Sequence, residues 1–140
     1  MSLLRKAGAT VGNNVVIAQG VRILGATKLT LEDDVSIARG TVLDARGQLT
    51  LRRGALIGFE SIILTSTHNS GHADLPVHEQ GMFFGPVTIG ACSWLGARCI
   101  VQPGTSIADN SIIGSGAVVT KNLDKSAIYA GVPARFIRAR

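Results

Sequence analysis

The chain has 140 residues and a formal net charge of +5, with 46% hydrophobic but only 4% aromatic residues. No apolar run approaches the roughly 18 residues that a membrane-spanning helix needs, and the N-terminus lacks the apolar stretch of a secretory signal, so we expect a cytoplasmic protein without a transmembrane segment. The basic residues are not interleaved with aromatic ones as in nucleic-acid-binding modules, so nucleic acid is not expected as a partner.

The dominant pattern along the chain is an aliphatic residue at every sixth position, in five groups of three. A period of six fits neither an α-helix nor a flat strand, but it fits a prism in which three short strands form one coil. The sequence therefore predicts one all-β domain, residues 1–140, folded as a parallel β-helix of about five coils. The five groups are Val11, Ile17 and Ile23; Leu31, Ile37 and Leu43; Leu51, Ile57 and Ile63; Ile89, Leu95 and Val101; and Ile107, Ile113 and Val119.

The fourth residue after most of these anchors is small or β-branched. A narrow prism needs this, because a second large side chain inside would overpack it. Cys99 occupies one of these inward positions and is expected to serve packing, and Thr67 is assigned to another.

The period breaks at two places. Residues 69–86 interrupt the prism after the third coil, and they hold or border all three histidines, His68, His72 and His78. Long excursions from a regular scaffold are usually functional, so this segment is predicted to be an active-site loop. The second break, residues 124–140, predicts a C-terminal extension that leaves the prism and covers or flanks the last coil.

Three stretches of the chain resemble the hexapeptide-repeat acyltransferases, and specifically their galactoside and maltose O-acetyltransferase branch. The first reads L-T-S-T-H at 64–68, and the second reads E-Q-G-M-F-F-G-P-V-T-I-G at 79–90, followed by W-L-G-A at 94–97. The third reads I-G-S-G-A-V-V-T-K at 113–121, together with A-G-V-P-A-R-F-I-R at 130–138. The resemblance implies a left-handed β-helix, a homotrimer with active sites between subunits, and acetyl-CoA as cosubstrate. Because the hexads begin by Val11, the N-terminal helical segment of that branch is expected to be missing.

His68 is the candidate catalytic residue. The resemblance implies that it acts as general base, and histidine suits this step because it titrates near working pH. From the residue alone, an ordinary surface histidine is the favoured interpretation, and only the T-x-T-H pattern of the branch favours the catalytic role.

The resemblance assigns the cofactor to the C-terminal half of the chain. Trp94 would form a wall of the pantetheine channel, although packing in a trimer is an open alternative. Basic side chains would face the phosphates, because the guanidinium fork suits phosphate geometry, while a plain surface role is the alternative for each. The full predicted set is Trp94, Gly96, Ala97, Ser115, Thr120, Lys121, Arg135 and Arg138.

The acceptor side departs from the branch. The branch motif T-H-P reads T-H-N here, and the asparagine that contacts the acceptor is absent. The expected acceptor is a sugar or a sugar-containing intermediate of surface-polysaccharide synthesis, acetylated on a hydroxyl. Acetylation of an amino sugar nucleotide on nitrogen and a non-catalytic trimeric scaffold are the alternatives. The predicted acceptor contacts are Arg39, Asp44, His72 and Glu79.

The histidines and nearby carboxylates also raise the possibility of a metal site, since the γ-class carbonic anhydrases share this β-helix. Those enzymes carry a G-H-x-x-x-x-H pattern, whereas the matching stretch here, residues 95–101, contains no histidine. The two cysteines have no metal-ligand spacing either. No metal is therefore predicted.

Overall fold

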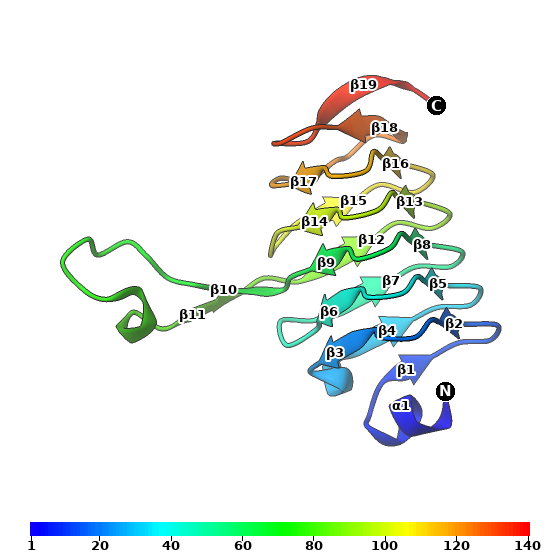
Figure 1. Ribbon diagram of the computed structural model, residues 1–140, viewed down its shortest axis with the longest axis horizontal. Coiled ribbons are helices and arrows are strands. Elements are labelled where there is room, and N and C mark those ends of the chain that lie inside the picture. Colours follow the sequence, from blue (N-terminus) through cyan, green and yellow to red (C-terminus); the bar gives the residue numbers. More distant parts are fainter.

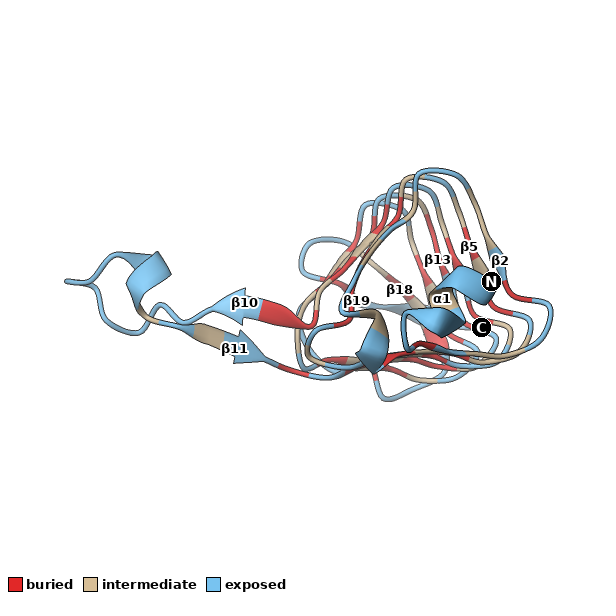
Figure 2. Cartoon of the chain, turned by 90° about the horizontal axis from the view of Figure 1, so that it is seen from below, coloured by how far each residue is buried: buried red, intermediate tan, exposed pale blue.

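A computed structural model describes all 140 residues, Met1–Arg140, as a triangular prism of stacked coils (Figure 1). Three sheets form the faces of the prism, and each coil adds one short parallel strand to each face. Figure 2 looks along the stack and shows the triangular outline. The predicted all-β parallel β-helix is confirmed.

The strands of each face follow one another along the stack. The first face contains β1 (Thr10–Val11), β4 (Leu29–Leu31), β7 (Leu49–Leu51), β12 (Val87–Ile89) and β15 (Ser106–Ile107). The second face contains β2 (Val16–Ile17), β5 (Ser36–Ile37), β8 (Leu56–Ile57), β13 (Trp94–Leu95) and β16 (Ile112–Ile113). The third face contains β3 (Arg22–Leu24), β6 (Val42–Asp44), β9 (Ile62–Ile63), β14 (Ile100–Val101) and β17 (Val118–Val119).

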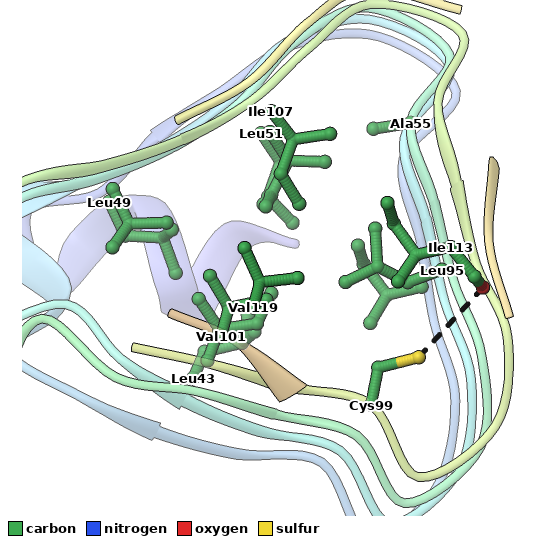
Figure 3. Packing of buried hydrophobic residues seen from close by; sticks show 14 of the residues in the cluster. Leu43, Leu49, Leu51, Ala55, Leu95, Cys99, Val101, Ile107, Ile113 and Val119 are labelled. Carbon is green, nitrogen blue, oxygen red and sulfur yellow. Dashed lines mark hydrogen bonds between the residues drawn. The ribbon is translucent and has the colours of Figure 1, made fainter. Parts of the chain in front are cut away.

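The hexad anchors stack directly on one another and fill the axis of the prism. On the third face, for example, Leu43 pairs in register with Ile63, and Ile63 pairs with Val101. Figure 3 shows such stacks from close by, with Leu43, Val101 and Val119 in one of them. Every anchor of the second to fifth coils is buried, whereas those of the first coil are half-buried because no coil lies beneath them.

Cys99 fills a small inward position, as predicted. Its thiol is buried and lies 3.3 Å from the carbonyl oxygen of Gly114. Burial raises the pKa of the Cys99 thiol, which keeps the group protonated and suits a packing role.

The excursion after the third coil is a β-hairpin rather than a structureless loop. β10 (Ser66–His68) pairs antiparallel with β11 (Met82–Phe84), and a short 3₁₀ helix, η2 (Val77–Glu79), lies in the tip. Figures 1 and 2 both show this hairpin projecting far from the prism. The inward placement of Thr67 is therefore wrong: the chain has already left the prism, and Thr67 is exposed.

Both ends add structure to the five coils. α1 (Ser2–Lys6) precedes the first coil, and η1 (Ala26–Lys28) forms a turn between β3 and β4. At the other end, β18 (Ala127–Ala130) pairs parallel with β16 and continues the second face by one level. Within the predicted extension, residues 124–140, only β19 (Arg135–Ala139) leaves the parallel stack. It pairs antiparallel with β18 and covers the C-terminal edge of the second face, as predicted.

None of the helices combines the length and the apolarity that a bilayer crossing requires.

The narrow core predicts a sharp contrast between two leucines. Leu95→Ala should lower the free energy of unfolding by roughly 2–5 kcal/mol, because Leu95 is fully buried and its loss leaves a cavity in the axis. Leu3→Ala should change it by about 0.5 kcal/mol or less, because that side chain is 80% exposed. Urea denaturation measures both, and equal effects would contradict the description of the core.

Candidate active site

Most of the predicted site residues lie at two corners of the prism. The second corner joins the second face to the third, and the third corner joins the third face to the first. The second corner comprises residues 18–21, 38–41, 58–61, 96–99 and 114–117. The third corner comprises residues 25–28, 45–48, 64–86, 102–105 and 120–122, so the hairpin projects from it.

His68 ends β10, where pairing with Met82 holds its backbone. Side chains alternate along a strand, so His68 lies on the same face of the hairpin as Ser66. The Ser66 hydroxyl donates a hydrogen bond to the Asp44 carboxylate in the preceding coil. The His68 face of the hairpin is therefore directed toward the N-terminal coils.

The opposite face of the hairpin is directed toward the C-terminal coils. Phe83 lies on this face, and its ring would stand 3.9 Å from a Cβ placed at Gly104 of the next coil. A Cβ at Gly85 would approach the same ring to 2.8 Å, so glycine is required there for the ring to lie against the prism. One face of the hairpin is thus directed toward the N-terminal coils and the other toward the C-terminal coils.

Asp44 is held by an ion pair inside the third corner. Its Oδ1 accepts a hydrogen bond from Arg46 Nε at 2.8 Å, and its Oδ2 accepts one from Arg46 Nη2 at 3.3 Å. Burial raises the pKa of Asp44, but hydrogen bonds from Arg46 and Ser66, together with the Arg46 charge, outweigh burial and hold the pKa below its usual range. The side chain is only 3% exposed, which does not fit the predicted direct contact with an acceptor.

The other predicted acceptor residues are separated from Asp44. Arg39 lies at the second corner, with its guanidinium carbon 6.0 Å from the centre of the Phe59 ring. His72 and Glu79 lie in the exposed tip of the hairpin, where the Gln80 side chain bonds the backbone of His72 in both directions. No three His, Cys, Asp or Glu side chains lie close enough together to hold a metal ion.

The predicted cofactor residues fall into two groups, and the first belongs to the second corner. Trp94 is exposed on β13 beside this corner, and the Ser115 hydroxyl accepts a hydrogen bond of 3.1 Å from the backbone N–H of Ala97. A Cβ at Gly96 would lie 2.6 Å from Ser115 Oγ, so glycine allows the two coils to approach here.

The second group lies at the C-terminal end of the third corner. Lys121 and Arg135 line a hollow of about 300 Å³ together with Lys125, a residue that the sequence-based set did not include. One carboxylate, Asp124, also lines the hollow, but the three cations outnumber it, and the excess of positive charge suits a phosphate-bearing ligand. Thr120 is the exposed neighbour of Lys121, while Arg138 lies on β19 outside the lining of the hollow.

The sequence-based set also missed three residues on the His68 side of the hairpin: Lys28, Arg46 and Phe84. They line a separate hollow of about 310 Å³ at the third corner. One signal was present in the sequence, because a coil length of 20 residues aligns Arg46 with Ser66 of the next coil.

Residues 86–121 match the bacterial transferase hexapeptide (six repeats) family. The chain is 32% identical over 138 residues to WcaF of Escherichia coli strain K12, a protein assigned as a colanic acid biosynthesis acetyltransferase, and the match covers 99% of this chain and 73% of WcaF. The chain belongs to the hexapeptide-repeat acetyltransferases. The predicted family and enzyme class are thereby confirmed.

Two solved structures place the chain near the predicted branch of the family. A maltose O-acetyltransferase from Clostridium difficile 630 matches with a TM-score of 0.91 at 25% identity, over 99% of this chain and 73% of that one. A galactoside acetyltransferase in complex with coenzyme A matches with a TM-score of 0.81 at 29% identity, over 99% of this chain and 68% of that one. The bound coenzyme A agrees with acetyl-CoA as the predicted cosubstrate.

The lowered pKa of Asp44 predicts a pH-dependent contribution to stability. A carboxylate whose pKa is lower in the folded state than its ordinary value of 3.8 stabilises the fold at any pH above 3.8. This contribution is lost as the pH falls below 3.8 and through the lower folded-state pKa. Asp44→Asn should therefore reduce the free energy of unfolding by roughly 1–3 kcal/mol at neutral pH. The gap to the wild type should narrow in acid.

Urea denaturation at neutral pH and in acid measures this difference. Asp74→Asn, in the exposed hairpin tip, is the matched control and should show little effect at either pH. A gap for Asp44→Asn that stays constant with pH would contradict the assigned ion pair.

Proposed function

We propose that the protein transfers the acetyl group of acetyl-CoA to a hydroxyl of a sugar or sugar-containing acceptor, with His68 as general base. The placement of His68 carries this proposal. It is the only one of the three histidines within a β-strand, and it shares its hairpin face with Ser66, which the buried Asp44 holds in place. A base must be held in position to work, and His72 and His78 lie in the exposed tip, outside the paired strands of the hairpin.

The reaction follows from the chemistry of the two substrates. The imidazole of His68 accepts the proton of the acceptor hydroxyl as that oxygen attacks the thioester carbonyl carbon. The carbon–sulfur bond breaks, the acetyl group remains on the acceptor oxygen, and the thiolate of coenzyme A takes up the proton from the imidazolium. A thiol has an ordinary pKa of about 8.5, so it leaves without a strong acid catalyst.

The names of the relatives favour a carbohydrate acceptor. WcaF is assigned to colanic acid biosynthesis, and the two structural relatives act on maltose and on a galactoside. We extend this acceptor class to the present chain, with the amine of an amino sugar nucleotide as the alternative. The cytoplasmic location stays a prediction.

We propose in addition that the hollow containing Lys121, Lys125 and Arg135 holds phosphates of coenzyme A. The enzyme would work as a homotrimer with active sites between subunits. The separation of the predicted residues supports this arrangement: His68 belongs to the third corner, whereas Gly96, Ala97 and Ser115 belong to the second. Three prisms around a threefold axis bring unlike corners of neighbouring subunits together.

Release of thiol from acetyl-CoA across a panel of sugars and amino sugars tests the proposed function. His68→Ala should lower turnover by about 10²–10⁴-fold, the usual cost of losing a general base, and should leave coenzyme A affinity nearly unchanged. His72→Ala and His78→Ala are the matched controls and should retain turnover. Lys121→Ala combined with Arg135→Ala should show the reverse pattern, with coenzyme A binding weakened by roughly tenfold or more.

Three outcomes would count against parts of the proposal. Near-normal turnover of His68→Ala with an inactive His72 or His78 variant would move the base to the hairpin tip. Acetylation of amino sugars only would make the enzyme an N-acetyltransferase. Absence of thiol release with every acceptor would favour the non-catalytic scaffold.

A further inference from the structure

The hollow beside Lys28, Arg46 and Phe84 has a chemistry that the proposed function leaves unexplained. It has a volume of about 310 Å³ and is lined by Gly25, Thr27 and these three residues. Two of the five lining residues are cations, and none is acidic. The hollow lies at the third corner on the N-terminal side of the hairpin, which is the side that His68 faces.

The Arg46 guanidinium is fixed in direction by the cluster behind it. Its Nε and Nη2 atoms donate to Asp44, and Nη2 also donates to Ser66 Oγ at 3.1 Å. Its Nη1 atom makes no hydrogen bond within the chain, and the side chain is 48% exposed. Since a guanidinium carries five N–H donors in a rigid plane, the buried carboxylate leaves one oriented edge of Arg46 for a ligand.

Lys28 and Phe84 complete this edge. Lys28 ends η1, is exposed, and forms no ion pair with an acidic residue. With Asp44 balancing Arg46, Lys28 gives the surroundings of the hollow a net positive charge. Phe84 is 52% exposed and pairs across the hairpin with Ser66, so its ring lies on the His68 face and offers an apolar surface to a sugar ring.

The position of the hollow relative to His68 fits a substrate that reaches both. Ser66 and His68 are two residues apart on β10, which corresponds to roughly 7 Å along the strand. Phe84, which lines the hollow, pairs with Ser66, so the hollow adjoins the hairpin face that carries His68, two residues further along the strand. It is also distinct from the hollow containing Lys121, Lys125 and Arg135, which lies on the C-terminal side of the hairpin.

We propose that the hollow of Lys28, Arg46 and Phe84 binds an anionic group of the acceptor, either a carboxylate or a phosphate attached to the sugar. The acceptor is then an acidic sugar or a sugar phosphate, not a neutral sugar. The inference rests on the proposed function for its choice of a sugar. It gives Asp44 a positioning role, because the buried carboxylate aligns Arg46 instead of touching the acceptor.

Equilibrium binding to the protein saturated with coenzyme A tests the inference without relying on turnover. Three probes share one ring: glucose, glucuronate and glucose 1-phosphate. Both anions should bind at least about tenfold more tightly than glucose at low salt, the change expected for one charge-assisted contact. Calorimetry measures the affinities, and a preference between the two anions identifies the group as carboxylate or phosphate.

The variants locate the binding site. Lys28→Gln should reduce the affinity for the preferred anion to near that of glucose, while leaving glucose binding unchanged. Lys28 has no ion-pair partner, so this variant does not put folding at risk, whereas Arg46→Gln also frees the Asp44 carboxylate. Lys6→Gln, an exposed lysine of α1, is the matched control and should have no effect.

Equal affinities for the anions and glucose, or an unchanged anion affinity in Lys28→Gln, would overturn the inference. This result is distinguishable from failure of the proposed function. If the proposed function fails but the inference holds, the anions will bind at the hollow as expected, but no acceptor will release thiol from acetyl-CoA.

Discussion

The fold depends on one constraint: the axis of the narrow prism takes one aliphatic hexad anchor per face in each coil, and a second large side chain, such as Leu29 or Leu49, is buried only on the first face. In-register stacking of Leu43, Ile63 and Val101 satisfies this constraint and fixes the alignment of every coil with the next. Because register is fixed along all three faces, residues one coil apart in sequence become neighbours at the corners. The corners are therefore where a regular, thin scaffold can present functional side chains.

The largest departure from the regular coil lies at the third corner. There the chain leaves the prism at the third coil and returns only at Val87, so that the hairpin divides the corner into two regions. On the C-terminal side, Lys121, Lys125 and Arg135 surround the hollow assigned to coenzyme A phosphates. On the N-terminal side, Lys28 and Arg46 surround the hollow assigned to the acceptor. His68 ends β10 on the N-terminal side of the hairpin, the side proposed for the acceptor, as its proposed role as general base requires.

Sequence periodicity was sufficient to predict the prism, because each aliphatic anchor reports a burial that the stacked geometry enforces. The six-residue period also predicted that Thr67 points into the prism, and this prediction was wrong. The period continues in the sequence up to Thr67, but the chain has already left the prism there. The roles of Asp44 and Arg46 were also beyond a one-dimensional pattern. Their pairing with Ser66 depends on contacts between coils, and these follow only when the 20-residue offset is applied to polar as well as apolar positions.

We propose that residues from two different corners act together, the third corner of one subunit with the second corner of the next. Co-expression of His68→Ala with Ala97→Trp, which fills the second corner, tests this most directly after purification of mixed oligomers through two different tags. Each variant alone should be inactive, whereas every mixed trimer contains one intact site out of three, so the purified mixed trimers should recover about a third of the wild-type activity. Mixed oligomers with no more activity than either variant alone, or a stable monomer in sedimentation, would contradict the claim.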